Sequence, residues 1–135
     1  MAFKHIQTEL KEGVAYLTLN RAPLNWLNIE MMEEINAYFE SLMKERTLKL
    51  LVIQALGKAF SSGHDLSEMT GRTITDYRRT FDVCTELMTR IQSIPQPVIA
   101  QVQGIATAAG CQLVATCDLA VASSEATFAT PGVKI

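Results

Sequence analysis

The chain has 135 residues, of which 48% are hydrophobic and 19% are charged, a composition that argues against disorder and coiled coils. Its length suits one domain or part of a larger one, and its apolar runs are too short to span a bilayer. With 12 basic and 14 acidic residues the net charge is -2, which gives no basic field for a nucleic acid or an anionic membrane.

The N-terminal third predicts a β-hairpin followed by a helix. Phe3–Leu10 alternates weakly, Gly13 supplies a turn, and Val14–Leu19 is rich in β-forming residues. After the loop at 21–27, Asn28 is a good helix N-cap. The helix of about four turns that follows has its apolar residues at helical spacing. These residues are Met31, Ile35, Tyr38, Phe39, Leu42 and Met43.

The middle of the chain predicts a strand, a long helix and a second strand. Leu50–Leu56 is a nearly continuous apolar run, typical of a buried strand in a parallel sheet. A helix is expected to start at Thr75 or Asp76 and to end before Pro95. Its apolar face comprises Tyr77, Phe81, Cys84, Met88 and Ile91. With a strand at Val98–Val102, this order predicts a right-handed crossover and a parallel sheet.

The last third predicts a short helix of small residues at Ala108–Cys117 and an apolar strand at Leu119–Ala122. No predicted helix covers that strand, and Val133–Ile135 resembles the start of a further element. Because an incompletely covered parallel sheet would expose apolar faces, we expect the chain to be an N-terminal part of a longer protein.

Two segments have the character of a small-molecule site, because each follows a strand of an open α/β sheet. They are Phe60–Leu66 and Gly104–Gln112. Small side chains in the second segment allow a ligand to approach the main chain, and a helix N-terminus offers unpaired N–H groups. Two converging N–H groups would stabilise an oxyanion. The alternative is that these small residues serve packing alone.

Three motifs resemble the crotonase superfamily of enoyl-CoA hydratases and isomerases. Phe60–Met69 is similar to its first signature, and 97–120 is similar to its second. The N-terminal loop at 19–27 is similar to a third family motif. Within the superfamily, the match is closest to enoyl-CoA hydratase domain-containing proteins with Gly-His-Asp in the first signature and Ala-Ala-Gly-Cys-Gln in the second. The resemblance covers essentially the whole chain.

The resemblance implies an α/β fold, a crotonase-like spiral of β-β-α units of which this is the N-terminal half only. Residues 1–135 would then form a truncated acyl-CoA-binding core. It also implies an acyl-CoA thioester ligand, with coenzyme A as part of the substrate and no other cofactor. A homotrimer or hexamer is implied for the full-length form.

The resemblance also implies the site residues. Backbone N–H groups of His64 and Ala109 would form an oxyanion hole for the thioester carbonyl. Residues along the coenzyme A arm would run from His64 to Ser67, and Leu24 and Ser62 would lie near the adenine and the pantetheine. The implied substrate-binding residues are therefore Leu24, Ser62, His64, Asp65, Leu66, Ser67 and Ala109.

Two departures from the family put ordinary hydration in doubt. Typical hydratases use two glutamates, and the matching positions here are Gln112 and Gly132. A carboxylate is needed to take a proton from water and return one to carbon. Gln112 can hold a water by hydrogen bonds but cannot accept its proton, and Gly132 has no side chain to offer. An isomerase would also need a base near Gly132.

His64 suggests an alternative activity, since Gly-His-Asp resembles the methylmalonyl-CoA decarboxylase branch of the superfamily. There the oxyanion hole would stabilise an enolate, and His64 could orient the carboxylate or donate a proton. Another interpretation is that His64 only packs at the pocket rim and uses its N–H alone. A third is a catalytically silent CoA-binding or regulatory protein, which Gln112 and Gly132 also permit.

Other residues receive structural interpretations. Asp65 is expected to cap the turn after the first signature, and Trp26 to be buried. Met43 is expected in the core. The three cysteines form no CxxC pair, and His and Cys are too few and wrongly spaced for a metal site. With a polar N-terminus unlike a signal peptide, these features predict a cytoplasmic location.

Overall fold

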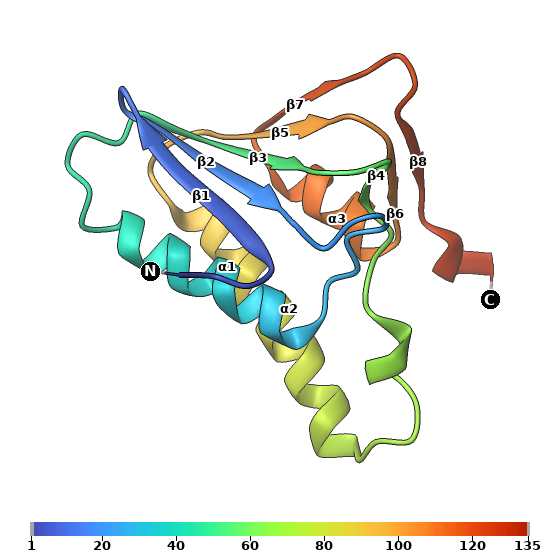
Figure 1. Cartoon of the computed structure of the whole chain (residues 1–135). Helices are drawn as coiled ribbons and strands as arrows, with labels where there is room; N and C mark the ends of the chain where they lie inside the picture. The colour runs from blue at the N-terminus through green and yellow to red at the C-terminus, as the bar shows by residue number, and fades with distance from the viewer. Residues whose placement is uncertain (1, 135) are drawn as a thin grey trace.

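A computed structural model describes residues 2–134, so Met1 and Ile135 lie outside the described range. The chain forms two sheets with three α-helices (Figure 1). The strands are β1 (Ile6–Lys11), β2 (Val14–Leu19), β3 (Leu50–Ala55), β4 (Ala59–Ser61), β5 (Val98–Val102), β6 (Ile105–Thr107), β7 (Leu119–Ala122) and β8 (Thr127–Ala129). The helices are α1 (Ile29–Leu42), α2 (Ile74–Ser93) and α3 (Ala109–Thr116), with 3₁₀ turns η1 (Leu66–Glu68) and η2 (Pro131–Lys134).

The chain alternates between the two sheets as it proceeds. One sheet has the strand order β1-β2-β3-β5-β7, and the other has the order β4-β6-β8. Each strand of the second sheet directly follows a strand of the first, and a helix or helical turn comes next. This repetition of β-β-α units confirms the predicted α/β spiral.

The predicted hairpin and crossover are also confirmed. β1 and β2 pair antiparallel, and the turn between them uses Glu12 and Gly13 at φ values of 53° and 83°. That left-handed backbone is the conformation for which glycine is suited. β3 and β5 are hydrogen-bonded neighbours in the sheet and run parallel, with α2 between them in the sequence, as the order of strand, long helix and strand predicts.

One face of the five-stranded sheet is covered by α1 and α2, which lie side by side beneath it in Figure 1. The buried apolar side chains between them form the core of the molecule. Among the largest of these are Leu17, Leu19, Met31, Met32, Ile35, Phe39, Leu51, Ile53, Leu87 and Ile91. As predicted, Asn28 caps α1, and its side chain accepts a hydrogen bond from the Met31 N–H at 2.9 Å.

The predicted start of the second helix was wrong by one to two residues. Its N-cap is Thr73, which exchanges hydrogen bonds with Asp76 in a capping box, so the helix begins at Ile74. Phe81 was assigned to the buried face, but 50% of it is exposed. It lies about 100° around the helix from the buried Thr80, at the boundary of that face.

Two further burial predictions were wrong. Met43 is 75% exposed because it is the C-cap of α1, beyond the last turn that the sheet covers. Trp26 is 43% exposed, since it lies in the loop before α1 and the neighbouring Asn25 and Leu27 take the buried positions. A loop residue has no periodic pattern from which its direction could be derived.

The second sheet was not predicted. Its strands have three residues each, which is too short to show an alternating pattern. The sheet matters because β4 and β6 lead directly into the two candidate site segments. Within residues 2–134, no helix is both long and apolar enough to cross a membrane.

Candidate functional site

The two segments predicted to form a site lie in direct contact. A Cβ atom added at Gly110 would overlap the Ser61 carbonyl oxygen, so the first turn of α3 packs tightly against the end of β4. At Gly63, an added Cβ would lie 3.3 Å from the Ala109 nitrogen. Glycine is therefore needed at both positions for the segments to approach, and it brings the backbone on either side of His64 close to the start of α3.

The backbone N–H groups of His64 and Ala109 are free to bind a ligand. The residues on either side of His64 already form backbone hydrogen bonds with Leu27. The Leu27 N–H donates to the Gly63 carbonyl at 2.8 Å, and the Asp65 N–H donates to the Leu27 carbonyl at 3.3 Å. Ala109 is the first residue of α3, where helical N–H groups have no partner in the helix. Among the hydrogen bonds formed within residues 2–134, neither N–H is a donor.

Ala108 turns the chain from β6 into α3 in an unusual conformation. Its φ and ψ are 53° and -125°, and it has no side-chain cap. Its N–H donates to the Ala129 carbonyl at 2.9 Å, which ties the turn to β8. A non-glycine residue at such a φ is strained, and such strain is concentrated at functional sites. The sequence did not reveal this conformation, because alanine normally avoids it.

The loop before α1 is joined to the first signature by backbone bonds. Ser62 donates its N–H to the Leu24 carbonyl at 2.9 Å, so the two residues predicted near the adenine and the pantetheine are neighbours. Asn25, which is fully buried, anchors this loop through its side chain. Its amide donates to the Leu56 and Ala59 carbonyls at 2.7 and 2.9 Å. Because Ala59 is the first residue of β4 and Leu56 precedes it, Asn25 fixes the loop against the start of the strand that leads to His64.

The Asp65 carboxylate stabilises the backbone conformation of the first signature. Its carboxylate accepts from the Ser67 N–H at 3.0 Å and the Ser67 hydroxyl at 2.6 Å, and lies 2.7 Å from the Arg21 guanidinium. The predicted capping role is confirmed, since Asp65 is the N-cap of η1. Burial raises the pKa of Asp65, but the hydrogen bonds from Ser67 and Arg21 outweigh it, so the pKa lies below its ordinary value.

The His64 side chain is half-buried against an aromatic ring. Its ring centroid lies 5.6 Å from that of Phe81 on α2, with the rings 79° apart, edge to face. The Nδ1 atom is buried and has no hydrogen-bond partner among the described residues. Burial lowers the pKa of His64, while the Leu27 backbone and the Glu68 charge oppose that shift. The imidazole is therefore mainly uncharged at neutral pH.

The remaining predicted binding residues flank an open surface. Leu66 is 74% exposed, Ser67 is exposed and Leu24 is half-buried. A cavity of about 210 Å³ opens beside Leu24. It is lined by Arg21, Ala22, Pro23, Leu24 and Trp26. This part of the surface therefore offers apolar contacts to a ligand, while the charge of Arg21 is paired with Asp65.

Gln112 and Gly132 are both exposed to solvent. Gln112 lies in the first half of α3, and Gly132 lies in η2. A Cβ atom added at Gly132 would meet nothing within 4 Å. A longer side chain could therefore be introduced there without a steric clash at its first atom.

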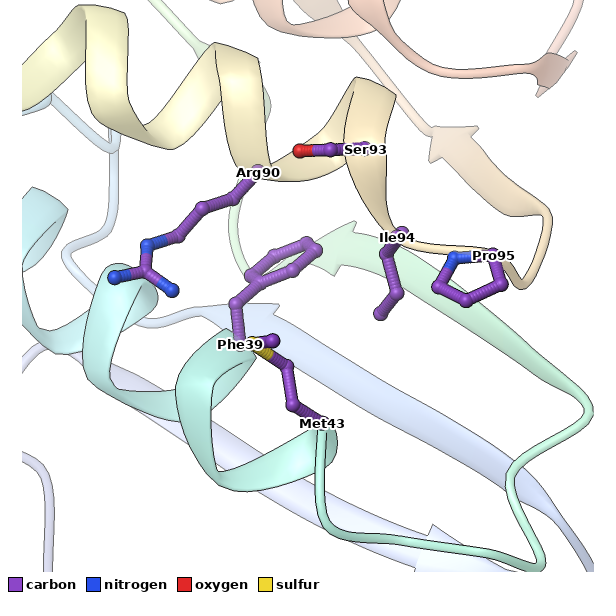
Figure 2. Close-up of a pocket in the computed structure, with 6 residues that line it drawn as sticks. All are labelled: Phe39, Met43, Arg90, Ser93, Ile94 and Pro95. Atoms are coloured by element: carbon purple, nitrogen blue, oxygen red, sulfur yellow. The ribbon is translucent and has the colours of Figure 1, made fainter.

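A second hollow lies away from all of these residues, where α1 and α2 end side by side (Figure 2). Its volume is about 230 Å³. It is lined by Phe39, Met43, Arg90, Ser93, Ile94 and Pro95, none of which the sequence singled out for a site. Arg90 donates to Glu86 at 2.8 Å, so its charge is already paired. Within residues 2–134, no group of three or more His, Cys, Asp or Glu side chains could hold a metal ion.

Comparison with known proteins identifies the class to which this spiral fold and its paired N–H groups belong. A model described as enoyl-CoA hydratase/isomerase matches residues 9–135. The chain therefore belongs to the enoyl-CoA hydratase/isomerase family, and the predicted resemblance is confirmed.

Particular relatives share more than the family pattern. The chain is 47% identical over 130 residues to enoyl-CoA hydratase domain-containing protein 3, mitochondrial, of Danio rerio, covering 95% of this chain and 45% of the relative. The protein of the same name from Homo sapiens is 43% identical over 126 residues, covering 92% of this chain and 42% of the relative. The chain thus spans about half the length of the curated relatives that it matches.

Solved structures agree with these relatives. An enoyl-CoA hydratase from Mycobacterium smegmatis superimposes with a TM-score of 0.92 at 45% identity, over 97% of this chain and 52% of that one. The human enoyl Coenzyme A hydratase domain-containing protein 3 gives a TM-score of 0.91 at 41% identity, over 97% and 53%.

The predicted cytoplasmic location was wrong, because these vertebrate relatives are named as mitochondrial proteins. Unpaired cysteines argue against an oxidising compartment but do not distinguish between reducing ones. The composition of a folded domain also does not record its destination, since import signals are separate from the fold.

Proposed function

We propose that this chain binds an acyl-CoA thioester and polarises the thioester carbonyl between the backbone N–H groups of His64 and Ala109. The observation that carries the proposal is that neither N–H group has an acceptor among residues 2–134, while their two segments pack together. Donors fixed in this way stabilise the negative charge that develops on the oxygen without reorganising during the reaction. Membership of the enoyl-CoA hydratase/isomerase family supports the same ligand class.

The coenzyme A arm would lie along the first signature and the loop before α1. Asp65 shapes the backbone there through Arg21 and Ser67, which leaves the exposed Leu66 and Ser67 available for contact. The cavity beside Leu24 suits an aromatic base, because proline, leucine and tryptophan side chains line it.

Ordinary two-glutamate hydration is not the activity that we propose. By the resemblance, the family positions for those carboxylates correspond to Gln112 and Gly132. The first signature has two carboxylates of its own: Asp65 is engaged by Arg21 and Ser67, and Glu68 accepts a hydrogen bond from the Ile29 N–H at 2.8 Å. Chemistry that relies on the oxyanion hole needs less acid–base equipment. The chain would therefore act on its thioester without the usual pair of glutamates.

A second candidate is decarboxylation of a β-carboxyacyl-CoA, which the half-buried His64 favours. In that reaction the bond from the α-carbon to the carboxylate breaks, its electron pair forms the thioester enolate, and CO₂ departs. A proton is then added to the α-carbon. A mainly uncharged imidazole can orient the carboxylate by a hydrogen bond, while its desolvated surroundings favour movement of the negative charge from the carboxylate to the enolate oxygen.

The proposal also covers the cellular location and the oligomeric state of the full-length protein. We include a mitochondrial location, since the vertebrate relatives are named as mitochondrial. A homotrimer or hexamer of the full-length protein also remains part of the proposal.

The test uses the full-length protein with crotonyl-CoA, following the enoyl-thioester absorbance and identifying any product by mass. Binding with a shift of the absorbance to longer wavelength would support carbonyl polarisation. Rapid gain of one water would contradict the absence of hydratase activity, and failure to bind any acyl-CoA would contradict the proposed function. Binding with no turnover of crotonyl-CoA or of a β-carboxyacyl-CoA would favour a silent CoA-binding protein.

Two variants separate the backbone role from side-chain roles. Ala109→Pro removes one N–H, and proline is tolerated at the first position of a helix. We expect it to abolish the absorbance shift and to lower any turnover by roughly 100-fold or more. His64→Ala keeps its N–H, so it should retain the shift. Circular dichroism would confirm that both variants are folded.

A further inference from the structure

Phe81 is the aromatic side chain that contacts His64. It lies on α2, a different element from His64, and half of its surface is exposed. Burying Phe81 in the core would stabilise the fold more than leaving it half-exposed. Its ring instead covers one side of an imidazole at the candidate oxyanion site.

A backbone group and one aromatic ring act on the His64 imidazole. The Leu27 backbone raises its pKa by hydrogen bonding, while Nδ1 has no hydrogen-bond partner among the described residues. Edge-to-face aromatic contact is directional and stabilises a pair of rings beyond simple burial. The contact with Phe81 therefore adds a directional interaction that favours one orientation of the ring.

We infer that Phe81 is a positioning residue, which holds the His64 imidazole in one orientation beside the thioester site and shields it from water. The inference rests on the proposed function, because it concerns the side chain next to the proposed oxyanion hole. It adds a residue from α2, which neither the two signatures nor the loop before α1 contains.

Shielding and orientation have separate consequences. Phe81 excludes water from one side of the ring, and burial is the largest influence that lowers the pKa of His64. The Leu27 backbone and the charge of Glu68 on η1 act in the opposite direction and would remain after Phe81 is removed. A smaller, non-aromatic residue at position 81 should therefore move the His64 titration upward, toward 6.5.

The experiment compares three variants of the full-length protein by NMR titration of His64, free of ligand, and by acyl-CoA binding across the same pH range. In Phe81→Leu we expect the His64 pKa to rise, and any pH dependence of binding or turnover to shift upward with it. Phe81→Tyr keeps an aromatic ring at position 81, so His64 should titrate as it does in the wild type. Ile74→Ala removes exposed apolar surface two turns earlier on α2 and should leave the titration unchanged.

The outcomes separate this inference from the proposed function. If His64 titrates identically in wild type and Phe81→Leu, Phe81 does not position it and the inference is overturned, whether or not acyl-CoA binds. If wild type binds no acyl-CoA, the proposed function fails, while the ligand-free titration still decides whether Phe81 holds the ring. A His64 shift in Ile74→Ala equal to that in Phe81→Leu would also overturn the inference.

Discussion

Ala108 stores strain at the start of α3, next to one of the two free N–H groups. Its φ of 53° with a ψ of -125° brings its Cβ close to neighbouring backbone atoms. Residues held in such sparsely populated regions cost about 1–3 kcal/mol. The bond from Ala108 to the Ala129 carbonyl and the packing of Gly110 on Ser61 hold the turn in place. The strain is thus the cost of directing the Ala109 N–H out of the helix.

Glycine at position 108 should relieve this strain. We expect Ala108→Gly to stabilise the protein by about 1 kcal/mol, because the strain relieved exceeds the entropy that glycine adds to the unfolded chain. Chemical denaturation would measure the free energy of unfolding. Ala115→Gly, at an exposed position within α3, is the matched control and should destabilise by about 1 kcal/mol. Equal destabilisation by both substitutions would show that Ala108 is not strained.

At the scale of elements, the Arg21–Asp65 pair joins the loop before α1 to η1. Asp65 is buried, and its charge is satisfied by Arg21 and by two bonds from Ser67. Backbone bonds such as Ser62 to Leu24 run alongside this pair. The pair and these backbone bonds therefore hold the loop against the first signature, and losing the carboxylate should loosen both.

Replacing this carboxylate should change both stability and its pH dependence. Asp65→Asn should lower the free energy of unfolding by about 2 kcal/mol at pH 7, the worth of a charged hydrogen bond. Because the folded pKa lies below the ordinary 3.8, the stability that Asp65 contributes is present above about pH 3.8 and is lost as pH falls through the lower folded pKa. Wild type should therefore approach the variant's stability in strong acid.

Urea denaturation at several pH values checks this expectation. Asp82→Asn, which replaces an exposed carboxylate on α2, serves as the control. It should lower the free energy of unfolding by less than about 0.5 kcal/mol, as is usual for surface changes. A difference between wild type and Asp65→Asn that stayed constant from pH 7 into strong acid would contradict the electrostatic account.

The elements differ in how far the sequence could predict them. The hairpin, both long helices and the crossover were predictable because turn residues and hydrophobic period are local signals. Strands as short as Ala59–Ser61 carry no such signal, which is why the second sheet was missed. The two site segments were recognisable from their small residues and their resemblance to a family. The contacts of Asp65 with Arg21 and of His64 with Phe81 join residues far apart in sequence, so only the fold brings them together.

At the scale of the whole molecule, the two ends of the five-stranded sheet differ. The outer strand β1 is exposed but carries mainly polar and charged side chains, including Glu9 and Lys11. The opposite outer strand, β7, has the sequence Leu-Ala-Val-Ala and is exposed throughout. Leu119 and Val121 are 62% and 64% exposed. An exposed apolar edge strand is a template for pairing with another chain, whereas charged residues discourage it.

We therefore expect the 135-residue chain to associate through β7 as its concentration rises. Sedimentation velocity over a range of concentrations would measure this association. Val121→Lys introduces a charge at the apolar edge and should shift the chain toward the monomer. Thr8→Lys introduces the same charge on β1 and should have no such effect, because that edge is already polar. A chain that stayed monomeric at all concentrations, or equal dispersal by both lysines, would show that β7 does not mediate association.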